Sequence, residues 1–226
     1  MTPRFSVLIP TLNEADNIAA TIAAARTTFG SEAEYLVSDG GSADGTAAVA
    51  AAAGARVLDT ERGRGRQLDA ALRAAVGDVC VMLHADTLLP GNAKTVIDAA
   101  LQRGVGGAFY LRFEEARLWW LARAINARSR VFRSATGDQA IFARRSVLLE
   151  IGGVPREDLF EDVRLWQKLK RAGRVQLVNA EVTTSARMWL QFGTWRTILL
   201  HWRLRALHSI GVAPKRLARR YPTARS

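Results

Sequence analysis

The chain has 226 residues, of which 49% are hydrophobic and 23% are charged, with a formal net charge of +11. These values are typical of one folded domain with its own core and exclude a disordered chain. The single cysteine, Cys80, excludes a disulfide framework and a cysteine-rich zinc module. The sequence has no run of 18 apolar residues and no apolar leader, so we expect a cytoplasmic protein.

Positive charge is concentrated in the second half. Residues 1–100 hold 8 basic and 12 acidic side chains, whereas residues 101–226 hold 24 and 9, and no acid follows Glu181. This asymmetry predicts a polyanionic partner, an anionic membrane surface or a phosphate-bearing substrate. Because arginine outnumbers lysine 28 to 4, coding bias could also produce the excess, so charge alone does not indicate nucleic-acid binding.

Strand and helix patterns alternate in the first half. The strand patterns cover residues 5–10, 35–38, 56–58 and 79–83. The helical patterns cover residues 13–29, an alanine-rich run that ends at Ala53 and begins at Ser42 or Asp44, and residues 65–75. This alternation predicts right-handed βαβ units and a parallel sheet, in which ligands bind at the carboxyl ends of the strands.

The second half mixes the two patterns. Strands are predicted at residues 105–113, 140–143 and 175–184, and helices at 115–130, 146–150, 161–171 and 191–210. No repeat and no Gly-, Pro- or Ser-rich linker separates the halves. We therefore expect an α/β fold whose mostly parallel central sheet is flanked by helices. It should comprise a main domain over residues 1–187 and a basic amphipathic helical tail over residues 188–226.

Polar residues follow three of the predicted strands. The first strand continues into residues 10–14 (Pro-Thr-Leu-Asn-Glu), the second into residues 38–46 (Ser-Asp-Gly-Gly-Ser-Ala-Asp-Gly-Thr) and the fourth into residues 84–86 (His-Ala-Asp). Such residues also serve as turns and helix caps. Three carboxylate-bearing turns at one sheet edge nevertheless favour a ligand site.

These three motifs, together with Phe160-Glu161-Asp162, resemble the successive motifs of family 2 glycosyltransferases with the GT-A fold. Residues 136–142 (Thr-Gly-Asp-Gln-Ala-Ile-Phe) further resemble a short subgroup assigned to arsenosugar biosynthesis. The resemblance implies an inverting transfer of a sugar from a nucleotide-sugar donor, above all a UDP-sugar, to a hydroxyl acceptor, with Mn²⁺ or Mg²⁺. Residues 1–90 would bind the donor and residues 91–187 the acceptor.

The resemblance also implies a set of donor-binding residues. They are Pro10, Thr11, Asn13, Glu14, Asp39, Gly41, Arg66, His84 and Asp86. Asp39 would accept a hydrogen bond from the imide N–H of uracil. Asp86 stands at the last position of an Asp-x-Asp motif and would ligate the metal, since carboxylate oxygens suit hard cations. His84 replaces the first acid of that motif, and both a ribose or phosphate contact and a purely structural role remain open for it.

Residues 62–67 (Arg-Gly-Arg-Gly-Arg-Gln) place three arginines just before a predicted helix. Glycines permit close approach of the backbone, and guanidinium groups match phosphate oxygens. We expect Arg66 to contact the diphosphate. For Arg62 and Arg64 a solvated loop is an equally open interpretation.

An inverting transfer needs a base that accepts the proton of the acceptor hydroxyl. The resemblance assigns this role to Asp162, with Glu161 as the positioning residue. Both acids also fall in the first turn of a predicted helix, where the helix dipole stabilises negative charge. Asp138 is the competing base, and we expect Gly137, Asp138 and Gln139 to bind the acceptor.

The predicted tail carries an apolar stripe at helical spacing, formed by Trp195, Ile198, Leu199 and Trp202. Packing on the main domain, a homodimer interface and a membrane-surface helix are the open interpretations. We expect the stripe to be buried against protein, and the arginines to give weak attraction to anionic lipid at the inner face of the cell membrane. The acceptor would then be a small molecule or lipid-linked. Residues 191–196 depart from the Gln-x-x-Arg-Trp motif of processive members, which favours a non-processive enzyme.

Two other functions compete with the glycosyltransferase. His84 in place of an acid would fit a nucleotide-sugar-binding protein that has lost catalysis, but the retained Asp86 and Asp162 disfavour it. The basic second half would fit a nucleic-acid-binding protein. We expect no nucleic-acid partner, because the charged loops lie where diphosphate chemistry needs them.

Overall fold

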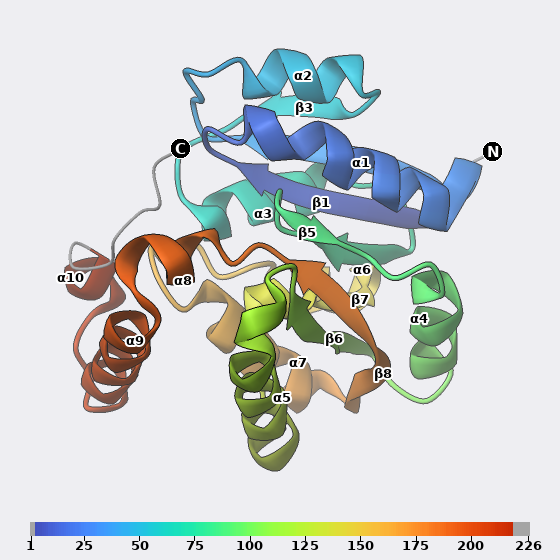
Figure 1. Ribbon diagram of the computed structural model, residues 1–226. Coiled ribbons are helices and arrows are strands. Elements are labelled where there is room, and N and C mark those ends of the chain that lie inside the picture. Colours follow the sequence, from blue (N-terminus) through green and yellow to red (C-terminus); the bar gives the residue numbers. More distant parts are fainter. Residues whose placement is uncertain (1–2, 219–226) are drawn as a thin grey trace.

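Within residues 3–218, which the computed structural model describes, an eight-stranded sheet runs in the order β3-β2-β1-β4-β7-β6-β8-β5 (Figure 1). Its strands are β1 (Phe5–Thr11), β2 (Ala33–Asp39), β3 (Arg56–Asp59), β4 (Val79–Met82), β5 (Thr87–Leu88), β6 (Gly106–Phe113), β7 (Phe142–Arg144) and β8 (Val175–Thr184). The α-helices are α1 (Ala15–Phe29), α2 (Thr46–Ala52), α3 (Arg64–Ala74), α4 (Ala93–Leu101), α5 (Trp119–Phe132), α6 (Arg145–Glu150), α7 (Glu161–Ala172), α8 (Arg187–Phe192), α9 (Thr194–Ser209) and α10 (Pro214–Ala218). Short 3₁₀ turns are η1 (Gly30–Glu32), η2 (Ala116–Leu118) and η3 (Gly137–Gln139).

The sheet is parallel in its first half and mixed in its second. Strands β3, β2, β1 and β4 are mutually parallel, as the alternating pattern predicts. Strand β7 runs antiparallel to both of its neighbours, β4 and β6, and β5 runs antiparallel to β8. The carboxyl ends of β1, β2 and β4 therefore share one edge, where the three polar motifs begin.

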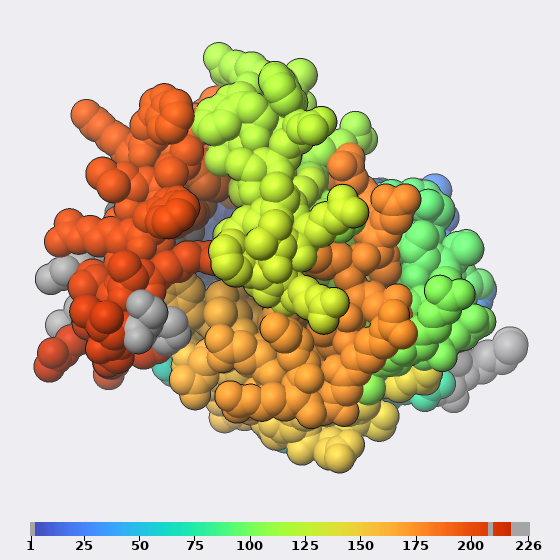
Figure 2. Space-filling view, turned by 90° about the horizontal axis from the view of Figure 1, so that it is seen from below, coloured from blue at the N-terminus to red at the C-terminus, as the bar shows by residue number. Residues whose placement is uncertain are grey.

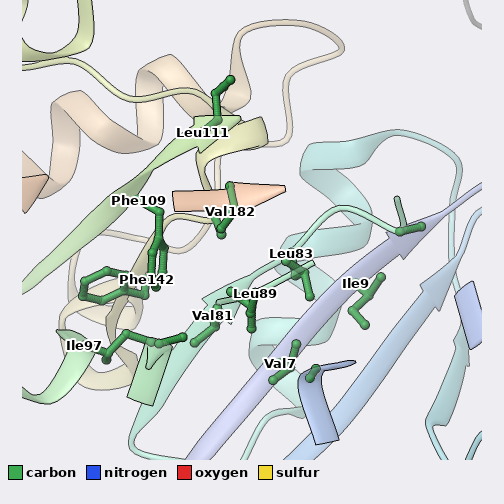
Figure 3. Close-up of a cluster of buried hydrophobic side chains, with 14 of the residues drawn as sticks. Val7, Ile9, Val81, Leu83, Leu89, Ile97, Phe109, Leu111, Phe142 and Val182 are labelled. Atoms are coloured by element: carbon green, nitrogen blue, oxygen red, sulfur yellow. The ribbon is translucent and has the colours of Figure 1, made fainter. Parts of the chain in front are cut away.

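Two apolar layers cover the faces of the sheet. Side chains alternate along β1, so that Val7 and Ile9 join one layer while Leu8 joins the other. Figure 3 shows that the first layer crosses between the halves of the chain, with Val7 and Ile9 on the same side of the sheet as Phe109 and Val182. The two halves therefore share a core. Cys80 is buried in the second layer, and burial raises the pKa of its thiol to about 12, which disfavours the reactive thiolate.

Two segments differ from the predicted elements. Strand β5 and helix α4 fall in residues 87–101, where no element was predicted, because Pro90 and Gly91 interrupt the periodicity. The helix predicted over residues 191–210 is two helices, α8 and α9, separated at Gly193, whose φ of +81° ends the first. In the described part of the chain, no helix is long and apolar enough to cross a membrane. The end of the predicted tail, residues 219–226, lies outside the described residues.

The prediction that the apolar stripe of the tail is buried is wrong. Three of its four residues are at least 71% exposed: Trp195, Leu199 and Trp202. The fourth, Ile198, is partly buried against the core. Helix α9 instead turns the opposite face inward, where Thr197 and Leu204 are each 2% exposed.

The contact with α8 explains the rotation of α9. Trp189 on α8 is buried, and its ring centroid lies 6.0 Å from that of Phe113 and 5.3 Å from that of His201. His201 stands on the same face of α9 as Leu204, so anchoring this ring turns the tryptophans outward. Trp195 still stacks on Trp120 of α5 at 5.5 Å.

Candidate functional site

Asp39 joins the carboxyl ends of β1 and β2. Thr11 and Asp39 are partners in the parallel register, and Thr11 Oγ1 donates to Asp39 Oδ1 at 2.8 Å. Ser42 Oγ donates to the same oxygen at 2.5 Å, and the N–H groups of Gly41 and Ser42 donate to Oδ2 at 3.1 and 2.8 Å. The carboxylate is 6% exposed and accepts four internal hydrogen bonds. A contact with uracil would displace or share one of them, so that role stays a prediction.

The turn after β1 is cross-linked to the turn after β2. Asn13 adopts a φ of +55°, which asparagine tolerates better than most residues. Its N–H donates to Ser42 Oγ at 2.8 Å, and its Oδ1 accepts from the N–H of Ala43 at 2.9 Å. Asp44 Oδ2 accepts from the N–H of Ala15 at the start of α1, at 3.0 Å. Both turns are therefore held in place without a ligand, directly beyond the half-exposed Pro10.

Glu14 connects the same turn to the start of the tail. Its Oε1 accepts from Arg187 Nη2 at 2.6 Å, and its Oε2 accepts from Asn17 Nδ2 at 2.7 Å. Its backbone N–H donates to Thr46 Oγ1 at 2.8 Å. Helix α8, which begins at Arg187, is thus ion-paired to the motif after β1.

Gln67 stabilises the sheet edge from the α3 side. Its Nε2 donates to the carbonyl oxygens of Thr11 and Ser38, both at 2.7 Å. A side chain at Gly40 would place its Cβ 3.1 Å from the same Nε2. Gly40 therefore leaves room for the amide that fixes the ends of β1 and β2.

The arginines before and within α3 have different partners. Arg66 Nη1 donates to Asp158 Oδ1 at 2.7 Å, and its Nε lies 3.3 Å from Glu61 Oε1. The hydrogen bond to Asp158 raises the pKa of Arg66. Its predicted contact with a diphosphate would need these pairs to be exchanged and stays a prediction. Arg64, in contrast, reaches Glu161 Oε1 at 3.4 Å.

Gly65 allows Arg64 to reach that acid. A Cβ at position 65 would lie 2.1 Å from the carbonyl oxygen of Pro155 and 3.1 Å from Glu161 Cβ. The missing side chain lets the segment before α7 pack on the first turn of α3. The close approach here is to protein backbone, where the sequence suggested an approach to phosphate.

The motifs at residues 84–86, 136–139 and 160–162 meet in one corner. His84 Nδ1 lies 3.1 Å from Asp138 Oδ1, and the N–H of Gly137 donates to Asp162 Oδ2 at 2.7 Å. A Cβ at Gly137 would lie 2.6 Å from His84 Nε2, so the site requires glycine at position 137. A small cavity here is lined in part by Arg64, His84, Gly137, Glu161 and Asp162.

The acids of this corner differ in their electrostatics. Glu161 is 3% exposed, and burial, assisted by the charge of Asp162, raises its pKa against the opposing charge of Arg64. Burial also acts to raise the pKa of Asp138, but the hydrogen bond with His84 and nearby positive charges outweigh it and lower that pKa. Asp138 is therefore stabilised as a carboxylate. Because its pKa is lowered, it is a weak base for the proton of an acceptor hydroxyl.

Asp86 follows β4 and is half-buried. Burial raises its pKa, and the charges of Glu14 and Asp138 add to this, while His84 and Arg187 oppose it. Among the described residues, no three His, Cys, Asp or Glu side chains form a ready metal cluster. A single carboxylate nevertheless fits Mg²⁺ or Mn²⁺ where substrate phosphates complete the ligand set.

Gln139 does not line the crevice. It is fully buried, its Nε2 donates to Phe109 O at 2.9 Å, and its Oε1 accepts from Ser129 Oγ at 3.0 Å and from the N–H of Thr136 at 3.1 Å. This corrects the expected contact with an acceptor, because the amide is occupied in the interior. Gln139 instead fixes η3, the turn that presents Gly137 and Asp138.

The comparison that identifies the chain is with the family model described as "Glycosyl transferase family 2", which matches residues 6–147. The chain belongs to glycosyltransferase family 2. No curated protein matches it. Its α/β architecture, with a mixed sheet flanked by helices, is the GT-A fold of these enzymes, as predicted.

Solved structures of other glycosyltransferases share this fold at low sequence identity. A mannosyltransferase from Pyrobaculum calidifontis, in complex with GDP-Man and Mn²⁺, is 23% identical with a TM-score of 0.68, covering 100% of this chain and 66% of that one. TarS 1-349 from S. aureus, in complex with UDP-GlcNAc, is 17% identical with a TM-score of 0.63, covering 82% and 58%. Glucosyl-3-phosphoglycerate synthase from Mycobacterium tuberculosis, in complex with Mg²⁺ and UDP, is 22% identical with a TM-score of 0.58, covering 81% and 70%. This family 2 glycosyltransferase thus spans about six tenths of the length of TarS 1-349.

Sequence reasoning on this family 2 glycosyltransferase missed three residues that shape the site. They are Gln67, Arg128 and Arg187. None carried a signal, because the surroundings of each are set by segments distant in the sequence. For Arg64, a solvated loop was one of the open interpretations, and the structure places its side chain 3.4 Å from Glu161 instead.

Proposed function

We propose that this protein is an inverting, non-processive glycosyltransferase that transfers a sugar from a nucleotide-sugar donor, above all a UDP-sugar, to a hydroxyl acceptor. The observation that carries the proposal is the corner where His84 pairs with Asp138 and the N–H of Gly137 binds Asp162. His84, at the first position of the Asp-x-Asp motif, contacts the turn whose backbone binds Asp162, and this supports a transfer reaction in the corner. The UDP-GlcNAc and GDP-Man complexes of the structural neighbours support a nucleotide-sugar donor.

The donor nucleoside would lie on the cross-linked turns after β1 and β2. We assign it to the predicted residues on these turns, which are Pro10, Thr11, Asn13, Glu14, Asp39 and Gly41. Their hydrogen bonds exist without ligand. A site ordered in advance loses less conformational entropy when the ligand binds. The donor-binding half, residues 1–90, is thus preorganised, and residues 91–187 would supply the acceptor side.

A divalent cation, Mn²⁺ or Mg²⁺, would be held by Asp86 together with the donor diphosphate. When bound it would neutralise the negative charge that develops on the departing nucleotide. Complexes of the structural neighbours with Mn²⁺ or Mg²⁺ support this assignment. For His84, contact with ribose or phosphate and a structural role remain open.

Asp162 is the base in this proposal. The acceptor oxygen attacks the anomeric carbon from the face opposite the nucleotide, the bond to the diphosphate breaks, and the hydroxyl proton passes to Asp162. The N–H of Gly137 holds Oδ2 of that carboxylate at 2.7 Å, which fixes its direction. Asp138 is the weaker candidate because its lowered pKa and its pairing with His84 oppose protonation. Glu161, buried beside Arg64, positions the first turn of α7.

The acceptor is a small molecule or lipid-linked. The resemblance of residues 136–142 to the arsenosugar subgroup is the argument for a small acceptor. A protein that binds nucleotide sugars without transferring them is the second candidate, favoured by His84 in place of an acid. Turnover of any nucleotide sugar separates the two.

Thermal unfolding with UDP and with GDP, each with and without Mn²⁺, tests the donor and the metal. We expect UDP to raise Tm more with Mn²⁺ than without, and Asp86→Ala to remove the metal-dependent part. Asp59→Ala, an exposed acid at the end of β3, is the control that should respond like the wild type. Equal stabilisation in excess chelator would contradict the metal assignment.

We further propose weak peripheral contact with anionic lipid at the inner face of the cell membrane. The contact surface is the basic helical face, defined as residues 116–133 and 187–218. It holds ten arginines, one lysine and no acid. Its apolar side chains that are at least 63% exposed are Trp119, Val131, Phe132, Trp195, Leu199, Trp202 and Ile210.

Exposed tryptophans among arginines suit the headgroup region of a membrane, where aromatic rings and cations both find partners. A homodimer through this face would bring like charges together, which costs free energy. Nucleic acid would satisfy the arginines but gives aliphatic side chains such as Leu199 and Ile210 nothing to bury against. Anionic lipid satisfies both kinds of side chain.

A further inference from the structure

Arg128, on helix α5, has two buried guanidinium nitrogens without a partner. Among the residues that the structure describes, its Nε and Nη2 are buried and make no hydrogen bond. A buried donor left unpaired destabilises a protein, and a charged donor does so more strongly. Such a side chain persists where something outside the chain completes its bonds.

The surroundings of Arg128 place it beside the corner of acids. Ser129, the next residue, donates from Oγ to Gln139 Oε1 at 3.0 Å, which ties this turn of α5 to η3. Helix α9 stands beside α5 in both views of the molecule (Figures 1 and 2), and Trp120 stacks on Trp195 at 5.5 Å. Arg128 therefore lies where α5, α9 and η3 converge.

The charges around Arg128 leave its guanidinium unneutralised. Burial and the charge of Arg205 on α9 lower its pKa to about 10, against the opposing charges of Asp138 and Asp162. Both acids are engaged elsewhere, Asp138 with His84 and Asp162 with backbone N–H groups. Arg128 and Arg205 thus repel each other, and within residues 3–218 neither Asp138 nor Asp162 is bonded between them.

We propose that Arg128 and Arg205 bind an anionic group of the acceptor, a phosphate or a carboxylate, beside Asp162. This rests on the proposed function, because it takes Asp162 as the group that receives the acceptor proton. Guanidinium groups bind such oxyanions through paired N–H donors. The donor motifs extend from β1, β2 and β4, whereas these arginines come from α5 and α9, so the anion they bind belongs to the acceptor.

The first test compares Arg128→Met with the wild type in thermal unfolding at constant ionic strength. Removing an unpaired buried charge should raise Tm of the empty protein, by about 2–4 °C if the gain is about 1 kcal/mol. Inorganic phosphate should raise Tm of the wild type and leave the variant unchanged. Arg130→Met, exposed on the same helix, should respond to phosphate like the wild type. Arg205→Met is the second variant and should also lose the phosphate response.

The outcomes separate the assignments. Stabilisation of Arg128→Met and Arg205→Met by phosphate to the wild-type extent would mean an adventitious ion only and would overturn the proposal. A lower Tm of Arg128→Met without phosphate would show a structural arginine and would also overturn it. If Arg128→Met lost its stabilisation by UDP with Mn²⁺, the anion would be the donor diphosphate and the acceptor assignment would be wrong. Absence of UDP stabilisation in the wild type would instead contradict the proposed function.

Two probes distinguish the source of the anion. Glycerol 3-phosphate represents a soluble acceptor, and phosphatidylcholine vesicles with and without added phosphatidic acid represent a lipid-linked one. Loss of the response to glycerol 3-phosphate in Arg128→Met, with vesicle binding unchanged, would assign a soluble phosphate. Loss of vesicle binding in Arg128→Met but not in Arg103→Met, an exposed arginine outside the basic helical face, would assign a lipid phosphate. If Arg128→Met and Arg205→Met both responded to glycerol 3-phosphate and to the vesicles as the wild type does, the proposal would be overturned.

Discussion

The sheet edge and the basic helical face are organised in opposite ways. At the edge, the turns after β1 and β2 are closed by hydrogen bonds within the chain, and the carboxylate of Asp39 accepts four of them. On the basic helical face, tryptophans are exposed, and the buried Nε and Nη2 of Arg128 make no hydrogen bond among the described residues. The first region satisfies its polar groups within the chain, whereas the second exposes apolar side chains and leaves two buried nitrogens of Arg128 unpaired.

The difference indicates what each region binds. A preorganised edge suits a ligand of constant shape, as the nucleotide part of a sugar donor is. An apolar, positively charged face with unsatisfied groups suits a partner that brings negative charge and apolar area together. Asp138 and Asp162 lie where the two regions meet, and the largest effects are expected there.

Asp162→Asn should give the largest effect. The amide keeps the shape of the side chain but cannot accept the proton, so turnover should fall ~10²–10⁴-fold. The measurement is nucleotide release from the sugar donor that supports turnover, together with UDP-dependent Tm, which should stay near the wild-type value. If Asp138→Asn lost turnover and Asp162→Asn kept it, the base would be Asp138.

Gln67→Leu should destabilise the sheet edge at the ends of β1 and β2. The change removes the amide donor shared by the carbonyl oxygens of Thr11 and Ser38, of which Thr11 O keeps the N–H of Gly40 at 3.0 Å. Loss of this buried donor should cost about 1–3 kcal/mol. Chemical denaturation should show the loss, and stabilisation by UDP should weaken with it. Gln102→Leu, exposed after α4, is the matched control and should stay within about 0.5 kcal/mol of the wild type. A loss as small as that of the control would show that the edge is held by other contacts.

The combined change Trp195→Ser and Trp202→Ser should affect the basic helical face alone. Binding of the wild type to anionic vesicles should be salt-sensitive, since each basic residue near the surface contributes about 1 kcal/mol that salt screens. The double variant should bind these vesicles more weakly with unchanged Tm, and Val76→Ser, exposed at the end of α3, should bind normally. Absence of wild-type binding at low salt would refute the membrane contact.

The smallest effect is expected at His201. Burial lowers its pKa below 6.5, and the charges of Arg205 and Arg128 contribute, so the folded protein resists protonation that the unfolded chain accepts. Stability should therefore fall as the pH drops below 6.5 towards the folded pKa, with no contribution above 6.5. His201→Gln should make the decline of Tm between pH 7 and 5 shallower. An identical decline in both proteins would exclude this contribution.

The parallel half of the fold could be predicted because three of its four strands end at a polar motif that also stops the apolar pattern. The rotation of α9 could not be predicted, because it depends on the ring contact between Trp189 and His201 and on Gly193, which interrupts the helix. Periodicity identifies the apolar face of a helix but not whether a neighbour covers it.

At the site, the residues that come together were easier to predict than the hydrogen bonds that each of them makes. His84, Gly137, Asp138 and Asp162 come together in one corner, as their motifs suggested. Gln139 has the chemistry to bind an acceptor, but its amide is satisfied inside the protein. Pairing of this kind is decided by distant segments, which local sequence does not reveal.

The position of β7 has a consequence for synthesis on the ribosome. Strand β4 ends at Met82, and its partner β7 begins only at Phe142, so 60 residues must be added before that side of β4 is paired. Until then the nascent chain presents the apolar segment Val79–Met82 as an open edge, to which another extended chain can add. Chaperone demand should therefore peak while the chain is between these two lengths, and end once residues 142–144 leave the exit tunnel.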